Sequence, residues 1–490
     1  MSDQELFWGD LHNHNEVGYG KGALARSYLL ATNALDFFAF TPHGWWPDIP
    51  TDDADVRRQH LEGFQRAQDR WPEVLAVAEA ASRDGRFVAF VGFEWHSLGW
   101  GDCHVLFPGS QGEIIRADNL GALLDRACRA GALVIPHHPA YRLGWRGVNW
   151  DEYDDKLCPV VEVFSEHGDS FETPSPHGMY GHSMGGASLT QTVLEQLRGG
   201  RVLGLVASTD NHFGYPGCYG QGLTGVWAAT LTRDGILDAL RRRHTYAVTG
   251  DRIRLTFTLG DNMMGDVLPA DAPRDFDIHV DAMDEIDTVA LCKNGEVLRC
   301  WHNGNVTDEG RRRVLHIEWG WDRVGSRQET TWHIRGSVEN GHIDRICPCF
   351  VGGAGAVERV NLLTITDPSA FEVESFTSRA NVASTSSIVL ELEASAQGIL
   401  NLDVSGERAG QSFRLQRSIP LADLSGRDMW LATSDSLVAP KIRVGPAIPK
   451  GRLSLRAHFA DPDPGRRDFY FVTVRQKNGQ RAWASPIWCR

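Results

Sequence analysis

The chain has 490 residues, of which 42% are apolar and 23% are charged, and its formal net charge is −14. This length exceeds one ordinary core, so we expect two or three domains. The acidic balance argues against general binding of nucleic acid, which needs a basic surface. No run of about 18 apolar residues occurs, so we expect no membrane-spanning helix.

The first residues and the cysteines both favour a cytoplasmic protein. Residues 1–5 lack the basic and apolar segments of a signal peptide, so we expect no cleaved leader. Nine cysteines, an odd number spread through a long chain, do not form a disulfide framework, and we expect them to be reduced. A homo-oligomer is compatible with this composition.

Strand-like and helix-like stretches alternate over residues 1–250. Helices are predicted at 22–33, 53–67, 120–130, 188–197 and 233–241, and Asp53 and Thr232 can cap two of them. This alternation, with about seven strands, predicts an α/β domain of the (β/α) barrel type with a largely parallel sheet. No GxGxxG or Walker-type loop follows a first strand, so a nucleotide-binding sheet is not indicated.

Metal-ligand side chains lie at the ends of these predicted strands. They are, in chain order, Asp10, His12, His14, His43, Glu94, His104, His137, His138, Glu166, His167, Asp210 and His212. His12 and His14 are two residues apart, as are Asp210 and His212, so in extended backbone each pair points to one side. Because barrels build their active sites from the ends of several strands, this pattern predicts a multi-metal hydrolase.

The types of ligand indicate the chemistry. Imidazole and carboxylate together suit Zn, Fe or Mn, and a cluster of this size can hold two or three divalent ions. Two such ions can share a bridging hydroxide, formed near neutral pH, that attacks an electrophilic centre. A carboxylate must bridge the ions, and Glu94 is the natural choice. We therefore expect catalytic roles for Glu94, Asp210 and His212.

From about residue 251 the sequence changes to short β-rich segments separated by Gly, Asn, Asp and Pro. Strands are predicted at 252–259, 277–280, 288–293, 313–319, 331–338, 361–366, 387–392, 398–404, 453–459 and 469–475. The Asn-Gly pairs at 294–295 and 478–479 predict hairpins. Residues 251–490 are therefore predicted to form a β-rich, sandwich-like domain, and residues 1–250 the catalytic domain.

The motifs around the ligands resemble those of the PHP (polymerase and histidinol phosphatase) superfamily of metal-dependent phosphoesterases. The resemblance covers about residues 5–250 in the family's motif order. It rests on DLHNH at 10–14, TPH at 41–43, Glu94, His104, PHHP at 136–139 and STDNH at 208–212. It implies a distorted seven-stranded (β/α) barrel, a trinuclear metal site and hydrolysis of phosphate esters. Residues 243–253 and 482–488 further resemble a PHP-related subfamily of unknown function, in which a β-rich C-terminal region follows the barrel.

The resemblance also implies a set of ligands for each ion. The first ion would be held by His12, His14, Glu94 and Asp210. The second would be held by Glu94, His104 and His137, and the third by His43 and His212. Many members carry a further histidine soon after the first HxH, whereas residues 15–21 contain none, so we expect two to three ions.

Other residues near the ligands are predicted to contact the substrate. These are His138, His167, Glu166, Tyr19, Lys21 and His182. The leading hypothesis is a metal-dependent phosphoesterase with a small-molecule substrate. Three alternatives are hydrolysis of a carboxylic ester, amide or lactone by the same hydroxide, a non-catalytic metal-stabilised binding module, and a nucleic-acid exonuclease. The excess of ligands over one closed four-ligand site argues against the module, and the acidic balance argues against the exonuclease.

Overall fold

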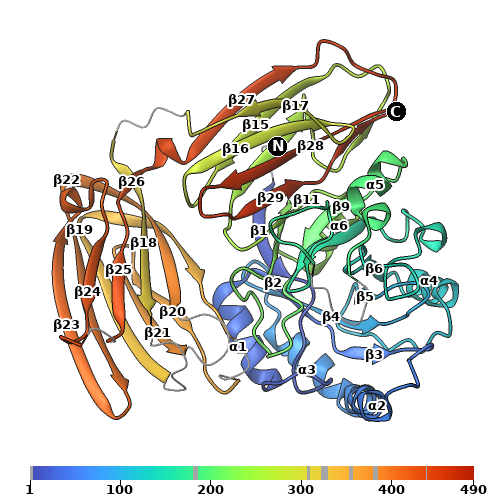
Figure 1. The fold of residues 1–490 in the computed structure, drawn as a ribbon, viewed down its shortest axis with the longest axis horizontal. Helices are drawn as coiled ribbons and strands as arrows, with labels where there is room; N and C mark the ends of the chain where they lie inside the picture. Colours follow the sequence, from blue (N-terminus) through green and yellow to red (C-terminus); the bar gives the residue numbers. More distant parts are fainter. Residues whose placement is uncertain are drawn as a thin grey trace. The chain divides into compact units, whose positions relative to one another are not determined.

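The computed structural model describes residues 4–179, 186–305, 310–321, 329–352, 357–378, 385–436 and 439–490, so His182 lies outside the described residues. The fold is mixed α/β and rich in strands (Figure 1). The chain forms two compact units. The first contains Met1–Val280, Asp287–His302 and Arg456–Arg490, and the second contains Asp281–Ile286 and Asn303–Leu455. This division differs from the predicted one at residue 250, because strands from both ends of the predicted C-terminal domain belong to the first unit.

The α-helices of the described residues all lie in the first unit. They are α1 (Leu24–Ala34), α2 (Ala54–Asp69), α3 (Trp71–Ala81), α4 (Leu120–Arg129), α5 (Val193–Arg198) and α6 (Arg233–Arg242). Both predicted caps are confirmed, because Asp53 accepts hydrogen bonds from the backbone of Asp55 and Val56, and Thr232 accepts one from Gly235. Among the described residues, no helix has both the length and the apolar character needed to cross a membrane.

The N-terminal strands form one large sheet and one small sheet. They are β1 (Glu5–Asp10), β2 (Phe37–Phe40), β3 (His43–Trp45), β4 (Val88–Trp95), β5 (Cys103–Phe107), β6 (Leu133–Pro136), β7 (Val160–Ser165), β8 (Gly168–Asp169), β9 (Gly204–Ala207), β10 (Leu223–Ala228) and β11 (Thr245–Val248). The large sheet runs β11-β10-β1-β2-β4-β5-β6, whereas β8, β7 and β9 pair separately. The hydrogen bonding of the described residues therefore does not confirm a closed seven-stranded barrel.

The prediction of a largely parallel sheet is wrong. The pairs β1–β2 and β2–β4 are parallel, but β4–β5, β5–β6 and β1–β10 are antiparallel. The short connection between β4 and β5 explains part of this difference. Only residues 96–102 join β4 to β5, and a parallel connection needs about a dozen residues or more.

The later strands of the first unit extend this architecture. They are β12 (Arg254–Leu259), β13 (Asn262–Met263), β14 (Val267–Leu268), β15 (Asp275–Asp281), β16 (Ile286–Lys293), β17 (Glu296–Trp301), β27 (Ser454–Ala460), β28 (Asp468–Gln476), β29 (Arg481–Ala484) and β30 (Ile487–Cys489). Strand β29 pairs with β11, so the end of the chain continues the N-terminal sheet. Both predicted hairpins are confirmed, and Asn294 and Gly295 have the positive φ angles that a type I′ turn requires.

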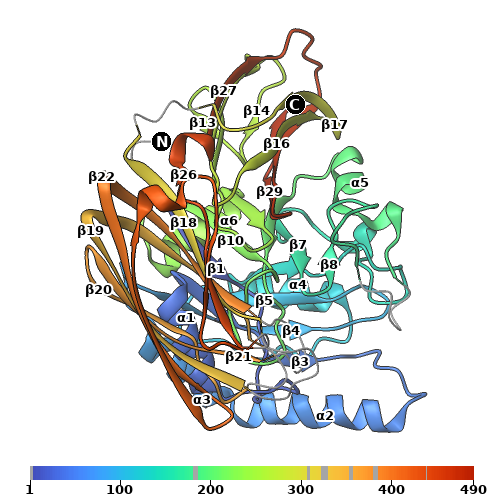
Figure 2. The same ribbon diagram turned by 60° about the vertical axis from the view of Figure 1, so that its left-hand side comes forward.

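The second unit is built around a nine-stranded antiparallel sheet. Its strands are β18 (Arg312–Gly320), β19 (Glu329–Cys349), β20 (Leu362–Asp367), β21 (Ala370–Ser378), β22 (Thr385–Arg408), β23 (Gln411–Pro420), β24 (Met429–Ala432), β25 (Lys441–Val444) and β26 (Ile448–Pro449). Figure 2 shows the long strands β19 and β22 side by side, as their pairing requires. The predicted strands at 387–392 and 398–404 are both parts of β22.

Glu391 on β22 gives the second unit a testable pH dependence. It is buried and bonds to Arg345 and to Lys450, whose Nζ lies 2.8 Å away. Burial raises the pKa of this carboxyl, but the two cations lower it by a larger amount, so the net shift of the pKa is downward. Glu391 therefore contributes fully to the stability of the folded state above its unfolded-state pKa of about 4.3. This contribution is lost as the pH falls through its lower pKa in the folded state.

We expect Glu391→Gln to lower the free energy of unfolding of the second unit by about 2 kcal/mol at pH 7, because it leaves two partly buried cations without their carboxylate. The loss should shrink towards pH 3. Urea unfolding at both pH values measures it. Glu393→Gln is the control, since Glu393 is on the same strand and its carboxylate forms an ion pair with the exposed Arg312, and it should cost less than about 0.5 kcal/mol. Equal losses in both variants at pH 7 would contradict the assignment.

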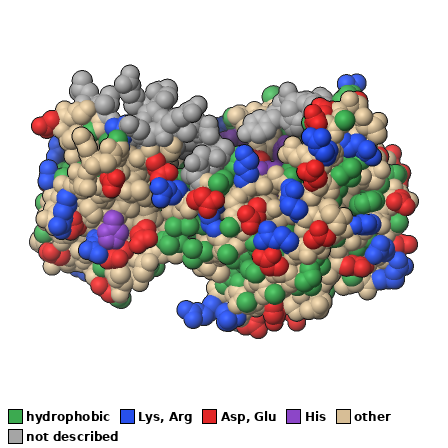
Figure 3. All heavy atoms as spheres, turned by 90° about the horizontal axis from the view of Figure 1, so that it is seen from below, with side chains coloured by type: hydrophobic (Ala, Val, Ile, Leu, Met, Phe, Trp, Pro, Cys, Tyr) green, Lys and Arg blue, Asp and Glu red, His purple; other side chains and the backbone are tan. Residues whose placement is uncertain are grey.

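The surface carries charges of both signs. On the face drawn in Figure 3, the side chains of Lys and Arg are interspersed with those of Asp and Glu. This mixture agrees with the moderately acidic net charge of the chain.

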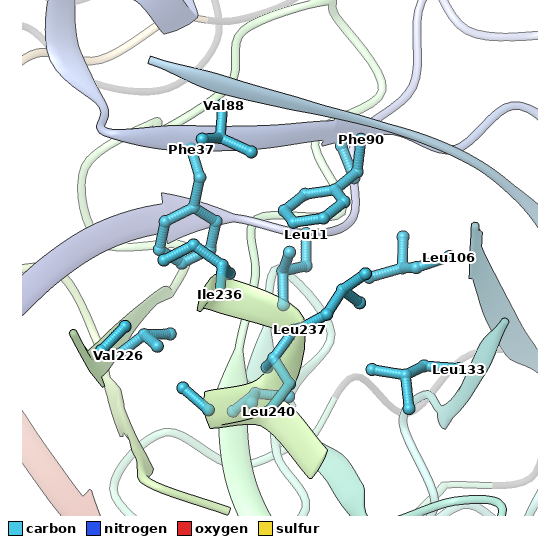
Figure 4. Close-up of a cluster of buried hydrophobic side chains, with 14 of the residues drawn as sticks. Leu11, Phe37, Val88, Phe90, Leu106, Leu133, Val226, Ile236, Leu237 and Leu240 are labelled. Carbon is cyan, nitrogen blue, oxygen red and sulfur yellow. The ribbon is translucent and has the colours of Figure 1, made fainter. Parts of the chain in front are cut away.

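A hydrophobic core in the first unit fixes the strands whose ends carry the predicted ligands. Figure 4 shows Ile236, Leu237 and Leu240 of α6 close to apolar side chains of the strands. The other labelled core residues are Leu11, Phe37, Val88, Phe90, Leu106, Leu133 and Val226. The three α6 residues lie on one face of the helix because of their spacing. A close-packed core of this kind holds the strand ends, and the polar residues that follow them, in fixed positions.

Candidate metal centre

The predicted metal ligands converge in the first unit. His12 and His14 follow β1, His43 begins β3, Glu94 is in β4, His104 is in β5, His137 follows β6, and Asp210 and His212 follow β9. All are buried except His212, which is partly exposed. Overlapping groups have ligand atoms within 4.8 Å of one another: His14, His43 and His212; His12, His14 and Glu94; His12, His137 and Asp210; His12, His104 and Glu162. Because the groups share members, they form one continuous cluster.

The Oε2 atom of Glu94 is a focus of this cluster. The Nε2 atoms of His12, His14 and His43 lie 3.6, 3.4 and 3.4 Å from it. Among the residues that the structure describes, this oxygen has no hydrogen-bond partner. Burial would raise the pKa of Glu94, but the surrounding imidazoles, first His96 and then His12, lower it more. The pKa of Glu94 is therefore lowered, and its buried Oε2 faces imidazole nitrogens at distances longer than those of ordinary charge-assisted hydrogen bonds.

Asp210 faces imidazoles with both of its oxygens. Its Oδ1 lies 2.8 Å from Nε2 of His14 and 3.5 Å from Nε2 of His12. Its Oδ2 lies 3.2 Å from Nε2 of His137 and 3.1 Å from Nε2 of His167. Its backbone is left-handed, with a φ of +52°, a conformation that Asp and Asn adopt more readily than most residues. Asp210 thus links the two sides of the cluster.

Asp10 supports the turn that carries Asp210. It accepts hydrogen bonds from the backbone N–H of Thr209 at 3.0 Å, from Oγ1 of Thr209 at 2.6 Å and from the backbone N–H of Gly217 at 3.0 Å. Burial raises its pKa to about 6 against these bonds. Asp10 therefore orients the loop after β9.

The third group lies around His43 and His212. Their Nε2 atoms are 3.3 Å apart, and the ring of His14 stacks on that of His43 at 3.8 Å. The ring of Tyr19 also stacks on that of His43, and the two ring centroids are 3.5 Å apart. Lys21, also predicted to contact substrate, has an exposed side chain.

Solvent reaches the cluster at one edge. His212, Glu166 and His167 have side chains that are 28%, 21% and 14% exposed. Oε1 of Glu166 lies 2.9 Å from Nδ1 of His212, and burial raises the pKa of Glu166 despite that neighbour. His167 bonds through Nδ1 to the hydroxyl of Tyr141 at 2.7 Å, and burial lowers its pKa to about 4. His138, also predicted to contact substrate, is instead buried, with Nε2 3.4 Å from Asp102.

The structure adds a carboxylate and a histidine that the sequence analysis did not assign. Glu162 in β7 approaches Nδ1 of His137 at 2.6 Å and Nδ1 of His12 at 3.4 Å. His96 follows β4, and its Nε2 lies 3.5 Å from Glu94 Oε2. The signals were present: Glu162 interrupts an apolar strand, and His96 stands two residues after Glu94, the same spacing as in the other ligand pairs.

The electrostatics of the cluster favour cations. Burial, with nearby imidazoles, lowers the pKa of His14 and His104 to about 3. Carboxylates overcome burial at His137 and His212 and raise their pKa values to about 9. Protons on these two imidazoles thus balance part of the buried carboxylate charge. Metal ions can take over that role, because ligation replaces the protons of the ligands.

The residues fit divalent transition metals. Two ligands that are each about 2.1 Å from a tetrahedral ion lie about 3.4 Å from each other, and the distances around Glu94 Oε2 are 3.4 to 3.6 Å. Both ring nitrogens of the buried His104 lack a hydrogen-bond partner. Imidazole and carboxylate ligands without thiolate suit Zn, Mn or Fe. The cluster therefore has the donors, spacing and unsatisfied atoms of a metal centre.

The chain is similar to proteins of undefined activity. A family model described as a protein of unknown function (DUF3604) matches residues 206–275. An uncharacterized protein of Chlamydia pneumoniae is 28% identical over 323 residues, which cover 61% of this chain and 49% of that protein. One of Chlamydia trachomatis is 25% identical over 332 residues, 62% of this chain and 50% of that protein. The chain spans about half the length of these curated relatives.

One solved structure is also similar. It is a two-domain protein from Bacteroides vulgatus that contains a predicted PHP-like metal-dependent phosphoesterase. It is 12% identical, the match covers 86% of this chain and 96% of that chain, and the TM-score is 0.34. This similarity is too weak to establish a shared fold.

Proposed function

We propose that the chain is a metal-dependent hydrolase of phosphate esters whose active site is the histidine and carboxylate cluster of the first unit. The observation that carries the proposal is the buried Oε2 of Glu94, which faces Nε2 atoms at 3.4 to 3.6 Å and has no hydrogen-bond partner within the described part of the chain. The resemblance of residues 5–250 to the PHP superfamily supports phosphate esters as the substrate class. A distorted (β/α) barrel around the cluster is part of this proposal.

Two to three ions of Zn, Mn or Fe would be held by overlapping sets of residues. The first set is His12, His14, Glu94 and Asp210. The Nε2 atoms of the two histidines lie within 3.6 Å of each other, of Glu94 Oε2 and of Asp210 Oδ1. The second set is Glu94, His104 and His137, and the third is His43 and His212. Divalent ions in such sites lower the pKa of water and neutralise charge on the oxygens of a phosphate ester.

The protein's own groups have distinct roles in this proposal. Glu162 fixes the ring orientation of His137 through Nδ1, as carboxylates often do behind a ligand histidine. Glu166 lies at the solvent-exposed edge with a pKa raised above its ordinary value by burial, so it is suited to exchange a proton with a leaving group. Substrate would approach at this edge, beside His167 and Tyr19.

The substrate is proposed to be a small molecule. The acidic net charge and the mixture of charges on the face in Figure 3 support it over nucleic acid. Of the substrate contacts predicted from the sequence, the proposal uses Glu166 and His167, whose side chains are partly exposed at the edge of the cluster.

Metal analysis with a substrate panel tests the proposal. We expect two to three transition-metal ions per chain by mass spectrometry, and turnover of chromogenic phosphomono-, di- or triesters. Dialysis against a chelator should reduce turnover at least 100-fold, because the ions supply the activated water, and re-addition of Zn²⁺ or Mn²⁺ should restore it. Turnover of carboxylic esters alone would overturn phosphate esters as the substrate class and would favour carboxylic esters. One tightly bound ion without any turnover would overturn the enzyme assignment in favour of a structural module.

A further inference from the structure

His96 presents an unsatisfied nitrogen to Glu94. The side chain is wholly buried, and its Nε2 lies 3.5 Å from Glu94 Oε2. Neither atom has a hydrogen-bond partner among the described ranges of the chain. A charge-assisted N–H···O bond would be about 2.7 to 2.9 Å long, so the contact is not an ordinary bond between imidazole and carboxylate.

The other nitrogen of His96 is held in place. Nδ1 lies 3.0 Å from Oδ2 of Asp102, which is wholly buried. Asp102 also accepts hydrogen bonds from the backbone N–H of Ser97 at 3.0 Å and from Nε of Arg146 at 2.6 Å. Arg146 and His96 lower the pKa of Asp102 against its burial. Asp102 is therefore an ionised group that only accepts hydrogen bonds.

This arrangement shows which nitrogen of His96 bonds to Asp102. Nη2 of Arg146 lies 3.2 Å from Nδ1, but it also bonds to Asp102, and a guanidinium only donates. Because Asp102 only accepts hydrogen bonds and is closer to Nδ1 than Arg146 is, Nδ1 is the nitrogen of His96 that donates to Asp102. Nε2, the nitrogen that Asp102 does not hold, then faces the oxygen of Glu94.

A histidine with one ring nitrogen bonded to a carboxylate commonly ligates a metal ion through the other nitrogen, and His96 and Asp102 present this arrangement. Nε2 of His96 and Oε2 of Glu94 face each other at more than an ordinary hydrogen-bond distance. Their separation of 3.5 Å matches the spacing of about 3.4 Å for two ligands of one tetrahedral ion. His43 completes the arrangement. Its Nε2 lies 3.4 Å from the same oxygen of Glu94, and its ring stacks on that of His96 at 5.2 Å and 13°.

We propose that His96 is a further metal ligand that shares one ion with Glu94 and His43, and that Asp102 and Arg146 are positioning residues that fix its tautomer and orientation. The proposal rests on the proposed metal centre and extends it to a residue outside the ligand motifs. It is independent of which ester the protein hydrolyses.

The test measures metal binding, with no need for turnover. Metal-free protein is titrated with Co²⁺, and bound ions are followed by visible absorption and by mass spectrometry. We expect His96→Ala and His96→Gln to bind one ion fewer per chain, or to bind one ion at least tenfold more weakly. Asp102→Asn should keep the wild-type number of ions at saturation but weaken binding of one of them by about 10- to 100-fold, the usual effect of removing a group that orients a ligand.

His60→Ala is the matched control. The rings of His60 and His96 both lie 5.4 Å from that of Trp46, but Nδ1 of His60 bonds to the carbonyl of Val56 at 2.7 Å. This variant should bind Co²⁺ as the wild type does. Circular dichroism of every variant without metal checks that it folds.

Anomalous diffraction from wild-type crystals loaded with Co²⁺ decides the matter if the variants do not fold. A peak bonded to His96 Nε2 supports the proposal. Ions elsewhere in the cluster with His96 unbound, or folded His96 variants with wild-type binding, overturn it and leave the proposed function standing. A wild-type protein that binds no ions overturns both.

Discussion

Asp210→Asn is expected to lower kcat/KM by about 10³-fold, equal to about 4 kcal/mol, and to release at least one ion per chain. Each oxygen of Asp210 faces two imidazole nitrogens, at 2.8 to 3.5 Å. An amide offers one oxygen and an NH₂ group, which donates protons and carries no charge. Asn adopts the left-handed backbone of this position readily, so the fold should be kept. Steady-state kinetics and metal content measure the effect.

Asp169→Asn is the control for this variant. Asp169 is a buried carboxylate in the same unit, but it bonds to the hydroxyl of Ser175 at 2.6 Å and to the backbone N–H of Phe171 at 2.8 Å. Its substitution should leave the metal content unchanged. Full metal content and normal turnover in Asp210→Asn would remove Asp210 from the ligand set.

The ligand motifs could be predicted from sequence because the signal is local. His12 and His14 follow an apolar strand at a spacing that puts both side chains on one side, and the same holds for Asp210 and His212. The residues behind the ligands depend on which strands are neighbours. Glu162 reaches His137 from a strand that belongs to a different sheet. No spacing within one segment encodes such a contact.

Strand positions followed the apolar runs, but strand pairing did not follow from them. The short connection between β4 and β5 was visible in the sequence, and it favours an antiparallel pair. The pairing of β29 with β11 brings together Trp483 and Ala247, which are far apart in the chain, so local patterns cannot reveal it. This pairing is one reason why the compact units do not divide at residue 250.

Helix α3 shows a different limit. It is not among the predicted helices, because only Arg70 separates it from α2 and its first residue has no side-chain cap. Pro72 looks like the end of α2, yet it lies in the first turn of α3, where its missing N–H costs no hydrogen bond. The burial of Trp71, Val74 and Ala78 stabilises α3 where its local sequence signals are weak.

The second large effect is expected from Glu94→Gln. Glutamine has the shape of glutamate but no charge, and its NH₂ group would donate hydrogen bonds to the nitrogens that now face Oε2. The variant should therefore keep the fold, and kcat should fall by about 10³-fold or more, whereas KM should change by less than about tenfold. This division follows if Glu94 acts on the reacting centre and not on the rest of the substrate. Steady-state kinetics over a full range of substrate concentrations measures both constants.

The comparison with Glu162→Gln makes the Glu94 prediction specific. Glu162 is also a buried carboxylate among the histidines, but it approaches them at Nδ1, on the side away from Asp210 and Glu94. Losing a group that only orients ligands typically costs 10- to 100-fold, so Glu162→Gln should retain more activity than Glu94→Gln. The reverse order would mean that charge behind the ligands matters more than the carboxylate among their Nε2 atoms, and Glu94 would lose its bridging role. Because both variants remove one buried charge by the same chemical change, a general loss of stability cannot produce the expected order if their unfolding free energies are equal.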